Sequence, residues 1–371
     1  MLRRLATVPA IIALLACCAA SANAASGWKI QPTPNPPNGH FNTLSSVACT
    51  SISDCMAGGT IGGGIGLSEL WNGSKWRLQP VAPFGQAAPA LLDVSCPVAA
   101  SCLATTGLRV TEHWNGSAWA IEHLARPAPS FTSFEMPAVS CVTATDCIGF
   151  GAYTANRTCA GVAETWNGSS WAVQATVPGG CGRSPCRNVL NNCSLVSISC
   201  PSASGCMAVG GGVSEFWNGT TWASEPIASP GGILKPALAA VSCTAADNCM
   251  AVGLAGDSAI TKILAERWNG TAWAILPAPK PTGQHSAALS GVSCPSAANC
   301  TAAGSSSDTS GITKTLAEHW NGTAWAIQAT PSPSGSSESF LDGVSCPVAA
   351  HCTATGSFFG GPGSDTLAEA R

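Results

Sequence analysis

Short segments of alternating polarity recur along the chain, and residues 288–328 show the pattern most clearly. Residues 288–294 alternate between apolar and small side chains, as expected of a strand with one buried face. A tight loop separates them from residues 300–304, and a longer loop leads to residues 315–320. An Asn-Gly dipeptide then predicts a two-residue type I′ turn before residues 325–328. The segment therefore predicts four consecutive antiparallel strands.

Two motifs show that this four-strand unit repeats along the whole chain. Seven Cys-x5-Cys pairs mark the first two strands of successive units: Cys49 and Cys55, Cys96 and Cys102, Cys141 and Cys147, Cys200 and Cys206, Cys243 and Cys249, Cys294 and Cys300, and Cys346 and Cys352. Six Trp-Asn-Gly-(Ser/Thr)-x-Trp motifs join the last two strands: Trp71 and Trp76, Trp114 and Trp119, Trp166 and Trp171, Trp217 and Trp222, Trp268 and Trp273, and Trp320 and Trp325. A repeat of roughly 40–50 residues is typical of a propeller or a solenoid.

The two ends of the sequence together make up the seventh unit. Residues 366–371 align with residues 315–320, and residues 28–31 align with residues 325–328. A first strand that completes the last unit closes a ring and hides its sheet edges, whereas an open solenoid needs a cap at each end. We therefore predict an all-β fold, a seven-bladed β-propeller of four-stranded antiparallel blades, as a single domain over residues 25–371.

The N-terminal residues predict an export signal. Arg3 and Arg4 precede an apolar run, and small residues up to Ala24 offer a cleavage site, so we expect residues 1–24 to be a signal peptide. Lipoprotein processing at Cys17 is the alternative. Either route predicts a protein that is secreted or held in the cell envelope. No later segment is apolar over the length of a membrane span.

The cysteine content agrees with an oxidising compartment. Of 20 cysteines, Cys17 and Cys18 lie in the predicted signal peptide, which leaves an even number in the domain. We expect one disulfide within each Cys-x5-Cys pair, because the spacing and the few histidines do not suit zinc. Four cysteines lie outside the repeat and predict two further disulfides whose pairing stays open: Cys159, Cys181, Cys186 and Cys193.

Charge and composition narrow the function classes. The net charge is −3 and 9% of residues are charged, so the chain lacks the basic field of a nucleic-acid-binding protein. No motif predicts a cofactor, and we expect a monomer. One glutamate recurs in every unit, two residues before the Trp position: Glu69, Glu112, Glu164, Glu215, Glu266, Glu318 and Glu369. A ring of carboxylates suggests cation binding, but a position that recurs in every unit is better interpreted as part of the scaffold.

The repeat also resembles known families. The Asn-Gly-(Ser/Thr)-x-Trp element is similar to the Asp-box turn of sialidase-type propellers, with Asn in place of Asp. The Val-Ser-Cys and Cys-x-Ala-x-Gly elements resemble secreted bacterial repeat proteins of the actinobacterial type. The resemblance covers residues 28–371 and implies the architecture. It implies no single activity, since Asp-boxes occur in hydrolases, receptors and assembly factors alike.

One region departs from the repeat and supplies the candidate contact surface. Residues 151–159 predict a long loop that contains Tyr153, the only tyrosine of the chain, and Arg157. Arg183 and Arg187 lie in the next crossover, which topology places on the same face as the loops of variable length. Clusters of aromatic residues and arginine are frequent at binding surfaces. The alternative is a long loop that only needs extra disulfides to stay ordered.

These observations predict a binding or scaffold propeller that engages a glycan, a cell-wall polymer or an extracellular protein through its variable-loop face. A glycan-processing hydrolase or lyase of sialidase-like type is one alternative, and a purely structural envelope protein is another. Catalysis is disfavoured because no Glu base is placed beside Tyr153 and no Gly-x-Ser-x-Gly motif occurs. We therefore predict no catalytic residues and no metal site.

Overall fold

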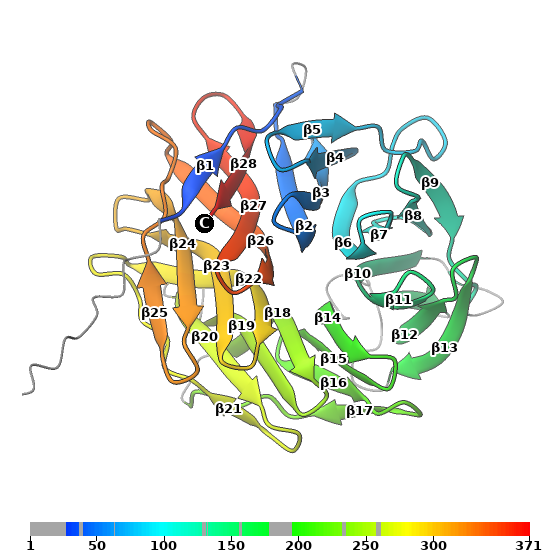
Figure 1. Cartoon of the computed structure of the whole chain (residues 1–371). Helices are drawn as coiled ribbons and strands as arrows, with labels where there is room; N and C mark the ends of the chain where they lie inside the picture. Colours follow the sequence, from blue (N-terminus) through cyan, green and yellow to red (C-terminus); the bar gives the residue numbers. More distant parts are fainter. Residues whose placement is uncertain are drawn as a thin grey trace, which may run out of the picture.

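Seven four-stranded antiparallel sheets surround a central axis in the computed structural model (Figure 1). The structure describes residues 27–36, 40–62, 64–127, 131, 133–155, 158–177, 195–231, 235–256 and 261–371. The predicted seven-bladed β-propeller is confirmed. The blades are numbered here in chain order, so the first blade holds β2–β5 and the seventh holds β26–β28 with β1.

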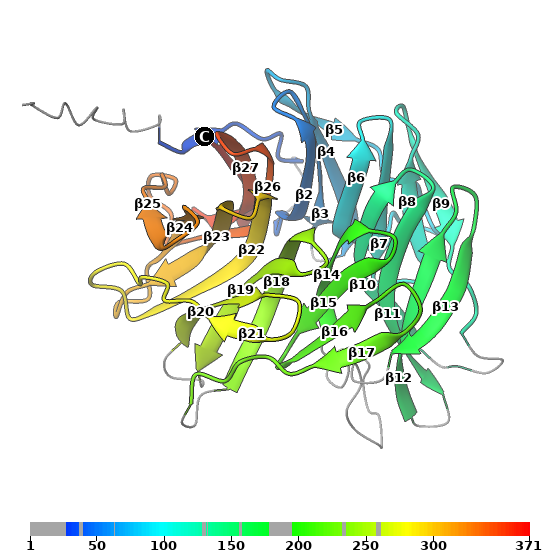
Figure 2. The same cartoon turned by 60° about the horizontal axis from the view of Figure 1, so that its bottom comes forward.

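Each blade runs from an inner strand near the axis to an outer strand on the rim (Figures 1 and 2). The inner strands are β2 (Thr43–Ser51), β6 (Leu91–Val98), β10 (Ser133–Thr143), β14 (Leu195–Ser202), β18 (Lys235–Ala245), β22 (Ser286–Ser296) and β26 (Glu338–Val348). The second strands are β3 (Asp54–Ile61), β7 (Ser101–Thr106), β11 (Asp146–Ala155), β15 (Gly205–Gly210), β19 (Asn248–Gly256), β23 (Asn299–Ser307) and β27 (His351–Phe359). The third strands are β4 (Ile65–Trp71), β8 (Val110–Trp114), β12 (Thr158–Trp166), β16 (Val213–Trp217), β20 (Thr261–Trp268), β24 (Thr313–Trp320) and β28 (Ser364–Ala370). The outer strands are β5 (Trp76–Gln79), β9 (Trp119–His123), β13 (Trp171–Val177), β17 (Trp222–Glu225), β21 (Trp273–Ile275), β25 (Trp325–Gln328) and β1 (Lys29–Gln31).

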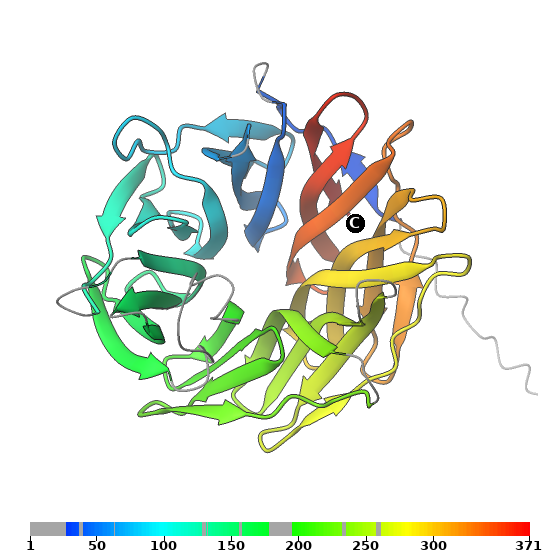
Figure 3. The same ribbon diagram turned by 180° about the vertical axis from the view of Figure 1, so that it is seen from behind.

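The ring closes through the first and last strands, as the sequence predicts. β1 pairs antiparallel with β28, with Lys29 opposite Ala370 and Gln31 opposite Ala368. Figure 3 shows this closure from behind, with blue β1 beside the red strands of the seventh blade. No blade of the ring is therefore left with three strands.

The tryptophans fill the gaps between blades. Within each of the six motifs the two indole rings lie 5.7–5.9 Å apart between centroids. Trp114 and Trp119 share a core cluster with Met56 of the preceding blade, and Phe216 lies beside Trp268 of the next blade. Large rings thus provide the apolar area that the many alanine and serine residues of the strands do not.

A ring of hydrogen bonds explains why serine precedes cysteine in the Val-Ser-Cys element. Ser345 Oγ accepts the backbone N–H of Cys49, which lies in the next blade, at 2.9 Å. The same bond, 2.9–3.0 Å long, joins five further pairs: Ser95 to Cys141, Ser140 to Cys200, Ser199 to Cys243, Ser242 to Cys294, and Ser293 to Cys346. In the first blade the serine position holds Ala48, which has no hydroxyl. Each bond ties the inner strand of one blade to the next.

All seven Cys-x5-Cys pairs form the predicted disulfides, each between the first and second strands of a blade. The bonds join Cys49 to Cys55, Cys96 to Cys102, Cys141 to Cys147, Cys200 to Cys206, Cys243 to Cys249, Cys294 to Cys300, and Cys346 to Cys352. So many disulfides are typical of proteins in an extracellular or otherwise oxidising environment.

The second cysteine of each pair is also a core residue, which the spacing alone does not indicate. These side chains are at most 2% exposed: Cys55, Cys102, Cys147, Cys206, Cys249, Cys300 and Cys352. Each belongs to one of the apolar clusters that fill the ring. These cysteines therefore have a structural role, because they are part of the packed core as well as of the disulfides.

The cysteines outside the repeat are described only in part. Cys159 is disulfide-bonded, as predicted, and is buried in β12. The other three lie outside the described residues, so their pairing stays a prediction: Cys181, Cys186 and Cys193.

The Asn-Gly turn differs from the two-residue type I′ turn that the sequence predicts. The strands are joined by four residues, as in the loop 321–324. Asn321 Oδ1 accepts the N–H of Thr323 at 3.0 Å, its hydroxyl at 2.8 Å, and the N–H of Ala324 at 2.9 Å. Gly322 has a φ of 94°, which only glycine adopts without strain. The asparagine therefore acts through its side chain, which explains the Ser or Thr two residues later.

Candidate functional site

The predicted contact surface lies mostly outside the described residues. This holds for Arg157, Arg183 and Arg187, so their contacts stay predictions. Tyr153 is described and lies in strand β11 rather than in a loop, because β11 continues to Ala155 before β12 begins. Its backbone is paired with Phe134, and its half-buried ring packs against the core of the third blade. Tyr153 therefore has a structural role besides any contact with a ligand.

The recurring glutamates are buried at the junctions between blades. All seven are fully buried, and the N–H groups of Ala125 and Ala228 donate to Glu164 and Glu266 from the preceding crossovers at 2.9 Å. Burial raises the pKa to about 8 for Glu69, Glu318 and Glu369. It raises the pKa to about 7 for Glu112, Glu164 and Glu266. Among the described residues no three His, Cys, Asp or Glu side chains come together as metal ligands. The contacts support the scaffold interpretation.

The central channel is a small hollow lined by the inner strands, with a volume of about 280 Å³. Two carboxyl groups line it. Asp93 accepts hydrogen bonds from Ser46 Oγ at 2.9 Å and from the N–H of Val139 at 3.0 Å, and burial raises its pKa. Burial also raises the pKa of Asp342 to about 6, although the hydrogen bond that Thr43 donates to this carboxyl group lowers it. Because the Asp93 bonds link three consecutive blades, we assign this residue to the packing of neighbouring blades.

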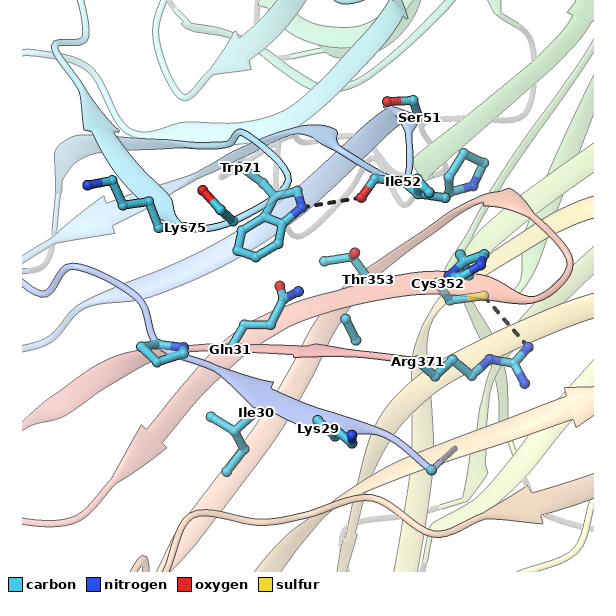
Figure 4. Close-up of a pocket in the computed structure, with 16 residues that line it drawn as sticks. Lys29, Ile30, Gln31, Ser51, Ile52, Trp71, Lys75, Cys352, Thr353 and Arg371 are labelled. Carbon is cyan, nitrogen blue, oxygen red and sulfur yellow. Dashed lines mark hydrogen bonds between the residues drawn. The ribbon is translucent and has the colours of Figure 1, made fainter. Parts of the chain in front are cut away.

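A larger hollow, of about 460 Å³, lies where the seventh blade meets the first, and we call it the seam pocket (Figure 4). Its wall includes Trp71 at the end of β4, Gln31 of β1 and Thr353 of β27. Lys75 and Ile52 extend it along the Asn-Gly turn and the Cys-x5-Cys loop of the first blade. These loops place the pocket on the face opposite the variable loops.

The pocket exists because the seventh blade does not cover Trp71. In five other blades a large apolar residue follows the second cysteine and packs against the first Trp of the next motif: Met56, Leu103, Ile148, Met207 and Met250. The tryptophans that they cover are at most 6% exposed: Trp114, Trp166, Trp217, Trp268 and Trp320. The seventh blade has Thr353 at this position, and Trp71 is only half-buried.

A second small residue enlarges the same gap. In two blades the residue before the Trp position reaches the next blade, since His113 lies 5.6 Å from Trp166 and Phe216 lies 6.2 Å from Trp268, measured between ring centroids. The seventh blade has Ala370 there, which lines the seam pocket. The hollow thus follows from two side chains that are smaller than their counterparts.

The pocket is rich in positive charge. Lys29, Lys75 and Arg371 line it together with His351, and its wall contains no Asp or Glu. Arg371 stands where the other blades have their first Trp, and its Nη2 donates to Thr301 Oγ1 at 2.8 Å. Gln31 Oε1 accepts the indole N–H of Trp76 at 2.9 Å, which leaves the amide NH₂ of Gln31 as a donor. The wall therefore offers mainly hydrogen-bond donors beside an indole ring.

Comparisons with known proteins bear on the fold. No family model matches the chain, and no curated protein matches its sequence. The solved structure of YCF48 bound to D1 peptide is similar with a TM-score of 0.57 and 11% identity, over 93% of this chain and 95% of that one. YCF48 from Cyanidioschyzon merolae is similar with a TM-score of 0.55 and 14% identity, over 92% of this chain and 98% of that one. The WD40 propeller domain of Doa1 is similar with a TM-score of 0.56 and 11% identity, over 92% of this chain and 96% of that one. At these identities the similarity places the chain in the class of β-propellers and goes no further. Within the described part of the chain, no helix has the length and apolar character to cross a membrane.

Proposed function

We propose that the chain is a binding propeller that is exported by its N-terminal signal and engages an extracellular partner, which is a protein, a glycan or a cell-wall polymer. The seam pocket carries this proposal. It combines a half-exposed indole with several cations in a hollow of the size that small ligands occupy, and burying the indole against a partner is favourable. The disulfides suit such a location.

The similar structures support binding rather than catalysis. One of them, YCF48, is bound to a peptide, and propellers present their loops and hollows as contact surfaces. The three glutamates whose pKa burial raises to about 8 lie between blades and line neither hollow. A general acid needs access to its substrate, so these groups do not provide one. The contact surface predicted around Tyr153 remains a prediction, as a second surface that the partner could bind.

The test is retention of the purified chain on immobilised polysaccharides, cell-wall fractions and extracellular proteins, with released products assayed in the same tubes. We expect saturable retention on one class and no product. Released sugars would replace the proposal with the hydrolase alternative. Absence of retention on every class would leave a structural role and contradict binding.

A further inference from the structure

The seam pocket differs in charge from the protein around it. The chain has a net charge of −3 and only 16 lysines and arginines, yet three of these line one hollow that has no Asp or Glu side chain in its wall. No described carboxylate forms an ion pair with Lys29, Lys75 or Arg371. A hollow that concentrates one sign of charge attracts the opposite sign. The electrostatics therefore point to an anionic ligand.

The shape of the wall narrows the ligand further. The indole of Trp71 forms a flat apolar surface, held by a hydrogen bond from its Nε1 to Ile52 O at 3.3 Å (Figure 4). Gln31 projects from β1 toward this ring, and Thr353 lies on the other side of the gap. A flat wall with donors around it suits a rigid ring that has C–H groups on its face and acceptors at its edge.

An acidic sugar unit has this combination, because a pyranose ring carries hydroxyl and ring oxygens at its edge and a carboxylate on one carbon. The side chain of an aspartate or a glutamate has the charge but no apolar face to lie on the indole. A volume of about 460 Å³ lies within the usual range for small-molecule sites. The observations thus favour a saccharide over an acidic peptide.

We propose that the seam pocket binds a carboxylate-bearing sugar unit of an acidic glycan; this rests on the proposed binding function and specifies its ligand. The sugar ring lies against Trp71, and its carboxylate pairs with Lys75 on the Trp71 side of the pocket, while Lys29 adds its charge from the opposite part of the wall (Figure 4). The NH₂ group of Gln31 donates to an oxygen at the edge of the ring. Arg371 is already bonded to Thr301 and contributes its charge from the wall.

The experiment measures calorimetric binding of two short acidic probes, an oligogalacturonide and a hyaluronan oligosaccharide, to the purified chain. The methyl-esterified oligogalacturonide is the matched neutral probe, and an acidic peptide of equal charge is the competitor. We expect one acidic sugar to bind about tenfold more tightly than the ester and than the peptide. We also expect affinity to fall as NaCl rises from about 50 mM to about 300 mM, since the charges lie at the surface.

Thr353→Met is the decisive variant, because methionine occupies the same position in three other blades and fills the gap without disturbing their strands. We expect it to abolish sugar binding while the melting temperature stays unchanged or rises. Lys75→Ala should weaken binding about tenfold, whereas Lys262→Ala, at an exposed position in the fifth blade, should not.

Four outcomes would overturn the assignment. Equal binding of the acid and its ester would show that charge is not recognised, and tighter binding of the peptide would assign the pocket to proteins. Full binding by a folded Thr353→Met variant would place the site elsewhere. If neither acidic sugar binds but the chain is still retained on another partner class, this inference fails and the proposed function stands. If neither acidic sugar binds and the chain is retained on no partner class, this inference and the proposed function both fail.

Discussion

Arg371 lies over the indole of Trp28, with its guanidinium carbon 5.9 Å from the ring centroid. In the six other blades the corresponding positions hold two tryptophans. A cation–π contact at the closure therefore takes the place of an aromatic pair. The two residues lie near opposite ends of the chain, and β1 and β28 bring them together.

Replacing Arg371 with alanine should weaken the closure. The change removes the contact with Trp28 and the hydrogen bonds from Nη2 to Thr301 and to Ala349 O. We expect the free energy of unfolding to fall by about 2–3 kcal/mol in chemical denaturation. Arg267→Ala, which removes one hydrogen bond to Asn248 within the fifth blade, is the control. Equal losses in the two variants would show that Arg371 has no special role.

The buried glutamates should make stability depend on pH. Burial raises the pKa of Glu318 to about 8, so the folded chain keeps a proton that the unfolded chain releases above its ordinary pKa of 4.5. The unfolded state then binds fewer protons, and the free energy of unfolding falls as pH rises from 4.5 to about 8. Thermal melts across this range should show the loss.

Glu318→Gln isolates one of these groups, because the amide is neutral at every pH. Relative to the wild type, the variant should gain at least about 1 kcal/mol between about pH 5 and about pH 8.5. Glu122→Gln, at a half-exposed position, is the matched control. A pH profile of Glu318→Gln parallel to the wild type would argue against titration of this carboxyl.

The Ser–Cys hydrogen bonds give a paired prediction of opposite sign. Ser345→Ala removes the acceptor for the N–H of Cys49 and should lower the free energy of unfolding by about 1 kcal/mol. Ala48→Ser supplies the hydroxyl that the first blade lacks, opposite Cys96, and should raise it by about 0.5–1 kcal/mol. Urea denaturation of both variants tests the pair. A loss in both would mean that Ala48 is required by packing.

The Asn-Gly loops should tolerate aspartate but not alanine. Asn321→Asp keeps the oxygen that accepts three hydrogen bonds, so we expect a change below about 0.5 kcal/mol. Asn321→Ala leaves two N–H groups of an exposed loop to water and should cost about 1–2 kcal/mol. Denaturation midpoints decide between them, and equal effects of both changes would rule out a role for the side-chain oxygen.

Repetition made the fold predictable from sequence. The cysteine spacing located the first hairpin of each blade, and the match between residues 28–31 and 325–328 located the closing strand. The turn type was wrong because an Asn-Gly dipeptide does not reveal the side-chain bonds that Asn321 forms. The predicted loop at residues 151–159 was too long, since β11 continues to Ala155 with Gly151 and Ala152 in its ladder with β12.

The seam pocket was not predicted, because it results from contacts between the two ends of the chain. Its signal was nevertheless present in the sequence. Thr353 interrupts a position that is Met, Leu or Ile in five units, and Ala370 and Arg371 depart from the repeat next to it. A departure from a repeat is most conspicuous in loops of variable length, whereas here the departures lie in strands that face a neighbouring blade.

The pairing of β1 with β28 also sets an order of events during synthesis. β1 is made before the other strands of the propeller and its partner β28 is made after them, so β1 has no sheet to join until β28 is made. The first six blades are each built from consecutive strands and form from local contacts as they emerge. Until β28 arrives, β26 and β27 lie beside the first blade, but the outer half of the seventh blade is missing. A ribosome stalled before β28 would therefore hold a two-stranded seventh blade whose exposed β27 edge invites pairing with another chain.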